Sequence, residues 1–569
     1  MGLSAGAAHA QAIERNLPPP SLRPSQEILA PNALPHEQDD RPIGPRLIGL
    51  LLLGPTDVVR TLPVNGVVPG LVPRINTRRG LEILRPFVGR PMSRKLIAEI
   101  EAAIARYYRK VGYPFVSVST PPQIIGTGIL QVRVVEFHAG TVATPGLSGT
   151  AQQVRNAIRL RPGEPVDALK LSADLDWLNR DPFHHVEAIF SPGDAFGQTD
   201  LNLQVTSTKP WQIYAGYANS GSAATGFDRY LLGGQIGGLL GPGSLASYQF
   251  TAAPDFFDSG GKVFGDADHP EYLSHGLRLA APVAGRQELE VSFDHVETNT
   301  VSRPFAARQI TDELSLGYRA SLSNFSRLPG DITLGVEAKQ ESRNVFFTGL
   351  DVLDNRIQVY QAYLGWSVQW SNALGGESFA ITIHDSPGGL NDLNSGAAFS
   401  SLTSGRVTRS SYQYVNLQFY QTTHLPAGYE ISNALIAQYA TDALPDTEQL
   451  GVGGEDLVRG YTLDDGAYDT AIVSRNEIHL PTLPLPLPSA HLYSLNSTDA
   501  FTPFAFLDAG FGANRETHKE AHPVSTGVGA RFQVGPHLAV NLIGAYALTN
   551  TMVTRSGDAM LTTKATLTF

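Results

Sequence analysis

Residues 450–461 read LGVGGEDLVRGY, and residues 502–512 read TPFAFLDAGFG. The first stretch has four glycines around Arg459, a density typical of backbone that adopts positive φ or lies close to another segment. The second reads as a strand whose alternation puts Phe506 and Asp508, its only charge, on one face. We therefore predict an ion pair between Arg459 on a glycine-rich hairpin and Asp508 on a strand wall. Spacing alone also allows a surface arginine and an unrelated carboxylate.

The chain around these two stretches, from residue 209 onward, consists of segments of about ten residues with alternating polarity. In residues 287–295, Leu289, Val291 and Phe293 fall on one face and polar side chains on the other. A soluble β-sandwich gives a similar pattern. An even number of segments, which can close without free edges, and a last strand ending in Phe569 on its apolar face favour a transmembrane barrel. The sixteen segments begin near Trp211, Phe227, Ser244, Tyr272, Gln287, Glu313, Asp331, Ile357, Glu377, Tyr412, Gly428, Ala471, Thr502, Val524, His537 and Met560.

Composition excludes several other classes of protein. The longest purely apolar run, residues 47–54, has eight residues, whereas a membrane-spanning helix needs about 20. The net charge of −11, without a long basic run, argues against nucleic acid as a partner. Cysteine is absent, which excludes a disulfide, a thiolate metal site and a cysteine nucleophile.

Residues 46–208 contain helical patterns and read as one small unit used twice. Ser93 is the expected N-cap of a helix that runs to about Val111, with apolar side chains at helical spacing and Gly112 after its end. Residues 89–93 (GRPMS) correspond to residues 163–167 (GEPVD). Each unit reads strand, helix, helix, strand, strand, which is the signature of an internal repeat. In the last strand of each unit, Leu130, Val132, Leu201 and Leu203 are expected to face the core.

The start of the chain reads differently. Ala8-His9-Ala10 is typical of a signal-peptidase site, but the residues before it are too few for the apolar segment of a signal peptide. This pattern fits either the remainder of a signal peptide or a disordered alanine-rich start. Prolines interrupt the following residues up to 45, so they are expected to form a linker without a long helix.

Several short stretches stand out as motifs: 178–182 (LNRDP), 191–193 (SPG) with 197–201 (GQTDL), 458–461 (VRGY) and 506–510 (FLDAG). In these motifs the chain resembles the two-partner secretion transporters of the haemolysin activation and secretion family, in the outer-membrane superfamily that combines polypeptide-transport-associated (POTRA) domains with a barrel. The resemblance covers residues from about 46 to 569.

This resemblance implies a mainly β fold, a 16-stranded antiparallel transmembrane β-barrel preceded by two small α+β POTRA domains. The expected parts are a signal-peptide remnant and linker (1–45), POTRA domain 1 (46–137), POTRA domain 2 (138–208) and the barrel (209–569), whose lumenal hairpin spans about 441–470. The implied site is an ion pair of Arg459 and Asp508 in the lumen, with Val458, Gly460 and Tyr461 completing the hairpin motif. Phe569 is implied as the barrel assembly signal. Family members often have an N-terminal helix in the pore, but the proline-rich start offers no long amphipathic helix here.

The implied function is an outer-membrane pore that recognises a large unfolded exoprotein of haemolysin or adhesin type and passes it from the periplasm to the cell surface. The implied partners are the N-terminal secretion domain of the exported protein, outer-membrane lipid and the barrel assembly machinery, and the implied state is a monomer that needs no cofactor or metal. The alternative in the same superfamily is a factor that inserts other barrels, although such chains usually carry more POTRA units. A passive porin would not need POTRA domains.

No constellation typical of an enzyme stands out, and we predict none. An outer-membrane phospholipase would need a Ser/His pair on the outer rim, and scattered Ser, His and Asp are expected in barrel loops. His184 and His185 are neighbours on a predicted strand, so they point in opposite directions and do not share a metal. His269, His275 and His295 have no ordered carboxylate spacing and are interpreted as barrel surface or lumen.

Overall fold

The computed structural model describes residue 28 and residues 37–145, 149–265, 270–302, 304–372, 374–485 and 499–569. The expected cleavage site, most of the expected linker, the region of an N-terminal pore helix and His269 lie outside these residues. The described chain forms two compact units, Ser25–Thr208 and Lys209–Phe569, which are treated separately below. No helix in the described ranges has both the length and the apolar character needed to cross a membrane.

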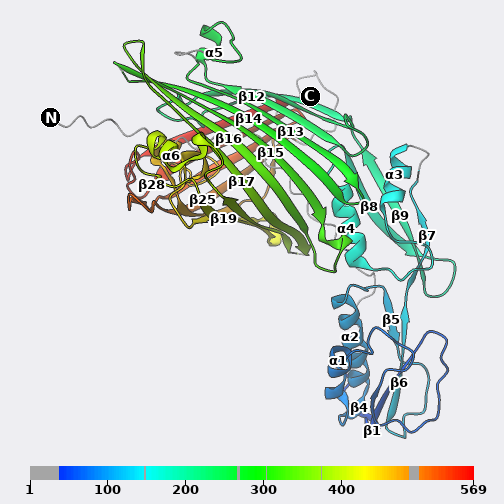
Figure 1. The fold of residues 1–569 in the computed structure, drawn as a ribbon. Coiled ribbons are helices and arrows are strands. Elements are labelled where there is room, and N and C mark those ends of the chain that lie inside the picture. The colour runs from blue at the N-terminus through cyan, green and yellow to red at the C-terminus, as the bar shows by residue number, and fades with distance from the viewer. Residues whose placement is uncertain are drawn as a thin grey trace. The chain divides into compact units, whose positions relative to one another are not determined.

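The first unit begins with a four-stranded sheet of order β3-β2-β6-β5, in which β2 and β6 are parallel. Its helix α2 presents Leu96, Ile100 and Ile104 at helical spacing and buries them against Leu52 and Val132 of the sheet. Figure 1 shows α1 and α2 on one side of the sheet strands. The elements are β1 (Pro42–Arg46), β2 (Gly49–Leu53), β3 (Gly66–Val68), α1 (Arg78–Glu82), η1 (Arg85–Phe87), β4 (Pro91–Ser93), α2 (Arg94–Lys110), β5 (Val116–Ser119) and β6 (Ile129–Glu136); β1 pairs with β4.

A second, smaller module repeats this arrangement within the same unit. Its sheet has the order β7-β9-β8, with β7 parallel to β9 as β2 is to β6. The elements are β7 (His138–Ala143), α3 (Gly149–Ala157), α4 (Ala168–Leu178), β8 (His184–Pro192) and β9 (Gln198–Ser207). The predicted order strand, helix, helix, strand, strand is that of the second module. The first module has the same order in β2, α1, α2, β5 and β6, but the short strands β3 and β4 and the 3-10 turn η1 are inserted in it, and the sequence pattern did not predict them.

Each module forms the same backbone hydrogen bonds at corresponding positions. Leu47 exchanges backbone hydrogen bonds with the segment at 89–90, and Ala139 does so with the segment at 163–164. Ser93 and Asp167 then cap α2 and α4 by accepting the amide N–H three residues later, as expected for N-cap residues. Leu130, Val132, Leu201 and Leu203 are all buried, which confirms that they face the cores.

The second unit is a closed antiparallel barrel, and sixteen long strands form its wall in the described part of the chain. The first strand pairs with the last, with Tyr214 opposite Thr568. The strands are β10 (Trp211–Ala218), β11 (Arg229–Gly237), β12 (Leu245–Ala252), β13 (Tyr272–Ala284), β14 (Gln287–Ser302), β15 (Phe305–Ser321), β16 (Asp331–Phe347), β17 (Leu350–Asn372), β18 (Gly375–Ser386), β19 (Tyr412–His424), β20 (Glu430–Ala440), β23 (Thr470–His479), β25 (Ala500–Ala513), β27 (Val524–Val534), β28 (Leu538–Ala547) and β29 (Ala559–Thr568).

Each of the sixteen predicted segments corresponds to one of these strands, and most start within two residues of the predicted position. The largest differences are at β15 and β17, which begin at Phe305 and Leu350 rather than near Glu313 and Ile357. β17 has 23 residues, whereas crossing a membrane takes about 9–11. Because β17 is longer than a crossing requires, its first residues need not alternate in polarity, and the pattern did not reveal them.

Two long connections leave the same rim of the barrel, since both follow a strand of odd position, the ninth and the eleventh, in an antiparallel wall. Residues 387–411, between β18 and β19, contain η3 (Asp392–Asn394) and α6 (Gly396–Leu402). Residues 441–469, between the eleventh and twelfth strands, form the predicted hairpin, whose arms pair through β21 (Leu450–Gly451) and β22 (Ala467–Tyr468). The remaining short elements are α5 (Asp255–Asp258), η2 (Leu322–Asn324), η4 (Pro426–Gly428), η5 (Asp446–Glu448), η6 (Leu463–Asp465), β24 (Leu483–Pro484) and β26 (Glu520–Ala521).

Candidate functional site: the lumenal hairpin

The floor of the site is a pair of aromatic rings on β25. Phe504 and Phe506 stand opposite Gly529 and Gly527 of β27 in the strand register. A Cβ atom at Gly527 would lie 2.6 Å from the Phe506 ring, and one at Gly529 would lie 2.2 Å from the Phe504 ring. The glycines on one strand therefore leave the space in which the rings of the next strand lie.

Arg459 lies on this floor and is almost completely buried. Its Nε and Nη2 donate hydrogen bonds to the two carboxylate oxygens of Asp508, at 2.7 and 2.8 Å. Its Nη1 donates to Glu477 on β23 at 2.5 Å, and its guanidinium carbon lies 3.8 Å from the centre of the Phe506 ring. Two carboxylates and one aromatic face thus hold a single guanidinium, the fork geometry that arginine suits better than lysine.

The electrostatics of the site keep this arginine charged. Burial alone would lower the pKa of the Arg459 guanidinium, but the hydrogen bond and charge of Asp508, followed by those of Glu477, raise that pKa above its ordinary value. Glu477 is also the meeting point of further cations, with Arg531 at 2.9 Å and Arg475 at 3.7 Å. Arg459 is therefore one part of a charged network that connects the hairpin to β23, β25 and β27.

The neighbours of Arg459 in the motif fix the hairpin against the same wall. Val458 and Tyr461 are buried together with Val473 of β23. The hydroxyl of Tyr461 accepts the amide N–H groups of Val524 and Thr549, both at 3.2 Å, so it joins the hairpin to the start of β27 and to the β28–β29 connection.

Gly460 fits this wall in both conformation and size. Its φ is +84°, a value that favours glycine. A Cβ atom there would lie only 3.0 Å from the Cβ of Ala545 on β28.

A second charged cluster, which the sequence pattern did not reveal, holds the arm of the hairpin that follows β20. Glu448 receives Lys339 of β16 at 2.8 Å, the Tyr414 hydroxyl at 2.7 Å and the Gln361 amide at 2.9 Å. Burial alone would raise the pKa of Glu448, but the ammonium of Lys339 and these hydrogen bonds lower it to about 2. Glu448 is therefore an anion held on the opposite side of the hairpin from Arg459, against β16, β17 and β19.

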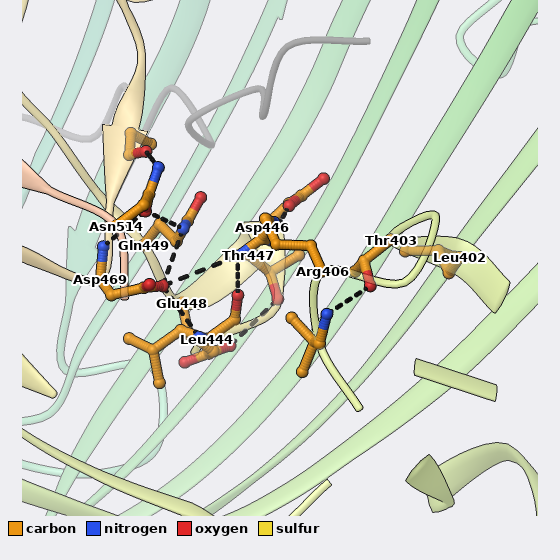
Figure 2. A network of polar contacts seen from close by, with 12 residues as sticks. Leu402, Thr403, Arg406, Leu444, Asp446, Thr447, Glu448, Gln449, Asp469 and Asn514 are labelled. Carbon is orange, nitrogen blue, oxygen red and sulfur yellow. Dashed lines mark hydrogen bonds and ion pairs between the residues drawn. The ribbon is translucent and has the colours of Figure 1, made fainter. Parts of the chain in front are cut away.

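The other arm of the hairpin, which leads to β23, has its own polar contacts. Asp465 accepts hydrogen bonds from the backbone N–H groups of Val553 and Thr554, at 3.2 and 2.8 Å, in the β28–β29 connection. Asp469 accepts the amide of Gln449 at 2.8 Å, and Figure 2 shows both side chains beside Asn514. The hairpin is thus bound along its whole length.

The structure brings Arg459 and Asp508 together as the sequence predicted, and it places Val458, Gly460 and Tyr461 around them. Phe569 is 57% exposed at the end of β29, and its N–H donates to the carbonyl oxygen of Ile213 at 2.8 Å, which joins the last strand to the first. Glu477 was missed, although its place at an inward position of a strand next to the Asp508 strand is a signal that could have found it. Asp446 and Glu448 had no such signal, because they lie outside any alternating segment.

The histidines do not form a metal centre in the part of the chain that the structure describes. No group of three or more His, Asp or Glu side chains is placed there to hold an ion. His184 lies 3.1 Å from Asp181, while His185 is exposed. His295, for which the sequence showed no ordered carboxylate spacing, nevertheless lies 2.7 Å from Asp312 on the next strand.

Comparison with known proteins finds two family models that match parts of this chain. The family described as "Haemolysin secretion/activation protein ShlB/FhaC/HecB" matches residues 327–532, a range that includes both Arg459 and Asp508. The family described as "POTRA domain, ShlB-type" matches residues 62–136.

Two curated relatives have the same general length as this chain. The outer membrane transporter CdiB of Dickeya dadantii is 24% identical over 415 residues, which cover 70% of each chain. The heme/hemopexin transporter protein HuxB of Haemophilus influenzae is 19% identical over 481 residues, which cover 82% of this chain and 78% of that one. Among solved structures, CdiB from Escherichia coli matches 96% of this chain and 94% of its own with a TM-score of 0.65 at 14% identity, and CdiB from Acinetobacter baumannii has a TM-score of 0.60. These structures share the fold.

Proposed function

Since this chain belongs to the haemolysin secretion and activation family of outer-membrane transporters, we propose that it is the transporter of a two-partner secretion system. It moves a large unfolded exoprotein from the periplasm to the cell surface through its 16-stranded barrel. The buried contact between Arg459 and Asp508 carries this proposal, since it fixes a hairpin inside a barrel that follows two POTRA-like modules. A passive porin has no use for such modules, and the site offers binding and gating groups rather than reacting ones.

The division of labour within the chain follows from this function. We propose that residues 46–137 and 138–208 are POTRA domains in the periplasm and that they bind the secretion domain of the exoprotein. The edge strands of their sheets are β3 and β5 in one module and β7 and β8 in the other. Such edges can add an extended segment of another chain through backbone hydrogen bonds.

The barrel acts as the membrane-embedded part of the transporter. Outward side chains such as Leu561 (65% exposed) and Leu567 on β29, and Phe569 directly after it, are apolar and exposed, as required of a surface that meets lipid. We propose that Phe569 is the signal read by the barrel assembly machinery and that one chain forms one pore. The hairpin of residues 441–469 is the part of the pore that has to move when a polypeptide passes.

Secretion in a reconstituted system tests the proposal. The chain, with a signal peptide, is expressed with a large β-helical exoprotein encoded beside it, in a host that lacks both genes. Exoprotein in the medium only when this chain is present supports the transporter. No release, together with a loss of other outer-membrane barrels when the chain is depleted in its native host, supports the insertion of other barrels instead.

The substitution Arg459→Ala connects this function to the hairpin. We expect secretion to fall while the folded barrel still accumulates in the outer membrane, because the strands of the wall keep their own hydrogen bonds. The folded barrel is measured by its altered electrophoretic mobility before and after heating. Disappearance of the folded barrel in this variant would contradict the separation of transport from assembly.

A further inference from the structure

The connection of residues 387–411 turns into the barrel instead of away from it. Phe399 and Leu402 of α6 are buried against Ile357 and Val359 of β17. These two β17 residues lie on the same face as Gln361, whose amide donates to Glu448 of the hairpin. Helix α6 therefore lies on the lumenal face of the wall. It packs on the part of the wall that also contacts the hairpin arm following β20.

One arginine connects this loop to the hairpin. Arg406 forms an ion pair with Asp446, donates to the carbonyl oxygen of Leu444 at 2.7 Å and lies 3.6 Å from Asp469. Arg343 of β16 approaches the same Asp446 at 3.2 Å. Figure 2 shows Arg406 reaching from the side of Leu402 and Thr403 toward the segment that begins at Leu444. Side chains of loop and hairpin thus share one set of buried charges.

The contact between Arg406 and Asp446 is buried, which raises the cost of breaking it. Asp446 is 6% exposed, and its carboxylate meets two guanidinium groups. Removing one partner of a buried ion pair is costly because it leaves a charge without compensation. If the hairpin left the lumen alone, Asp446 would lose both Arg406 and Arg343, because Arg343 belongs to the wall strand β16. If the hairpin and the loop move together, Asp446 keeps its contact with Arg406.

We propose that Arg406 and Asp446 form a latch that makes the loop of residues 387–411 and the hairpin of residues 441–469 leave the lumen as one body. Both residues are positioning residues, since they act through the hairpin. The inference rests on the proposed function for its meaning in secretion. The movement itself is measurable without any exoprotein.

A second ion pair between the same two segments provides a matched control. Arg409 of the loop pairs with Asp442 of the hairpin, but the Arg409 side chain is 69% exposed. Exposed pairs contribute little because water screens them and their side chains lose entropy on pairing. Arg409→Gln thus removes the same chemical group from the same loop without touching the buried latch.

Two reporters follow the movement, because the chain has no cysteine of its own. Val407→Cys places a thiol in the loop at a side chain that is 1% exposed, and Val458→Cys places one in the hairpin at a side chain that is 0% exposed. Each reporter is placed in the otherwise unchanged chain and combined separately with Arg406→Gln, Asp446→Asn or Arg409→Gln. The rate of reaction with a charged, membrane-impermeant maleimide is measured on the folded barrel, whose integrity is checked by its mobility before and after heating.

The latch predicts that Arg406→Gln and Asp446→Asn each raise labelling of both reporters at least about tenfold, while Arg409→Gln changes it less than about fivefold. Coupling is reciprocal, so Asp508→Asn, which weakens the hairpin alone, is expected to raise labelling at position 407 as well. Faster labelling at 407 with unchanged labelling at 458 would show that the loop moves by itself and would overturn the proposal, as would unchanged labelling at both. A failure of secretion with the expected labelling pattern counts against the proposed function and leaves the latch standing.

Discussion

The substitution Asp508→Asn tests how tightly the hairpin is held in the lumen. The amide keeps the size and shape of the carboxylate but removes its charge, so Arg459 loses a partner that holds it at 2.7 and 2.8 Å. Glu477 stays at 2.5 Å from the same guanidinium and compensates part of the loss. We expect the hairpin to be released more often while the strands around it stay paired.

The size of the effect follows from the burial of both partners. Asp508 is 0% and Arg459 is 2% exposed, and breaking such a pair costs about 3–5 kcal/mol. Because Glu477 remains, we take the lower end, about 3 kcal/mol, which corresponds to about a 150-fold larger population of released hairpin. The Val458→Cys reporter, compared with and without Asp508→Asn, measures that population through its rate of labelling.

The exposed pair of Asp442 and Arg409 again provides the comparison. Asp442→Asn removes one carboxylate from the same hairpin, but a pair with an exposed arginine contributes at most about 1 kcal/mol, so labelling is expected to rise less than about fivefold. If Asp508→Asn labels at the rate of the unsubstituted chain while the barrel is folded, the buried ion pair does not hold the hairpin and the reasoning fails.

Two further predictions concern other contacts in the chain. An ideal Cβ at Gly510 lies 3.0 Å from a γ-carbon of Val458, so Val458→Cys with Gly510→Cys is expected to form a disulfide that stops secretion until a reductant is added; secretion that continues with the disulfide fully formed would show that the hairpin need not leave β25. Ser93 accepts the amide N–H of Leu96, so Ser93→Ala is expected to lower the opening free energy of α2 by about 1 kcal/mol in hydrogen exchange, whereas Ser119→Ala on β5 changes it by less than about 0.5 kcal/mol.

The sequence was most informative where a physical constraint repeats along the chain. Lipid on one side of a strand and a wet lumen on the other impose alternation, and this alternation located each of the sixteen wall strands. The alternation gave no signal where this constraint ends. β17 is longer than a membrane crossing requires, so its first residues, from Leu350, need not alternate in polarity. Helix α6 packs by contacts whose partners lie far away in sequence.

The same reasoning explains why one anchor of the hairpin was predicted and the other was not. Arg459 and Asp508 lie in short motifs dense in glycine and aromatic residues, because a flat ring floor and a close backbone approach demand those residue types. Positions 446 and 448 require only an acidic side chain, Asp446 or Glu448, that reaches a basic partner on the wall. These partners, Arg343 and Lys339, come from a strand about one hundred residues earlier. A charge cluster that uses ordinary residues leaves no local pattern. Other functional contacts of this barrel are therefore to be sought among buried charges between distant strands rather than in its motifs.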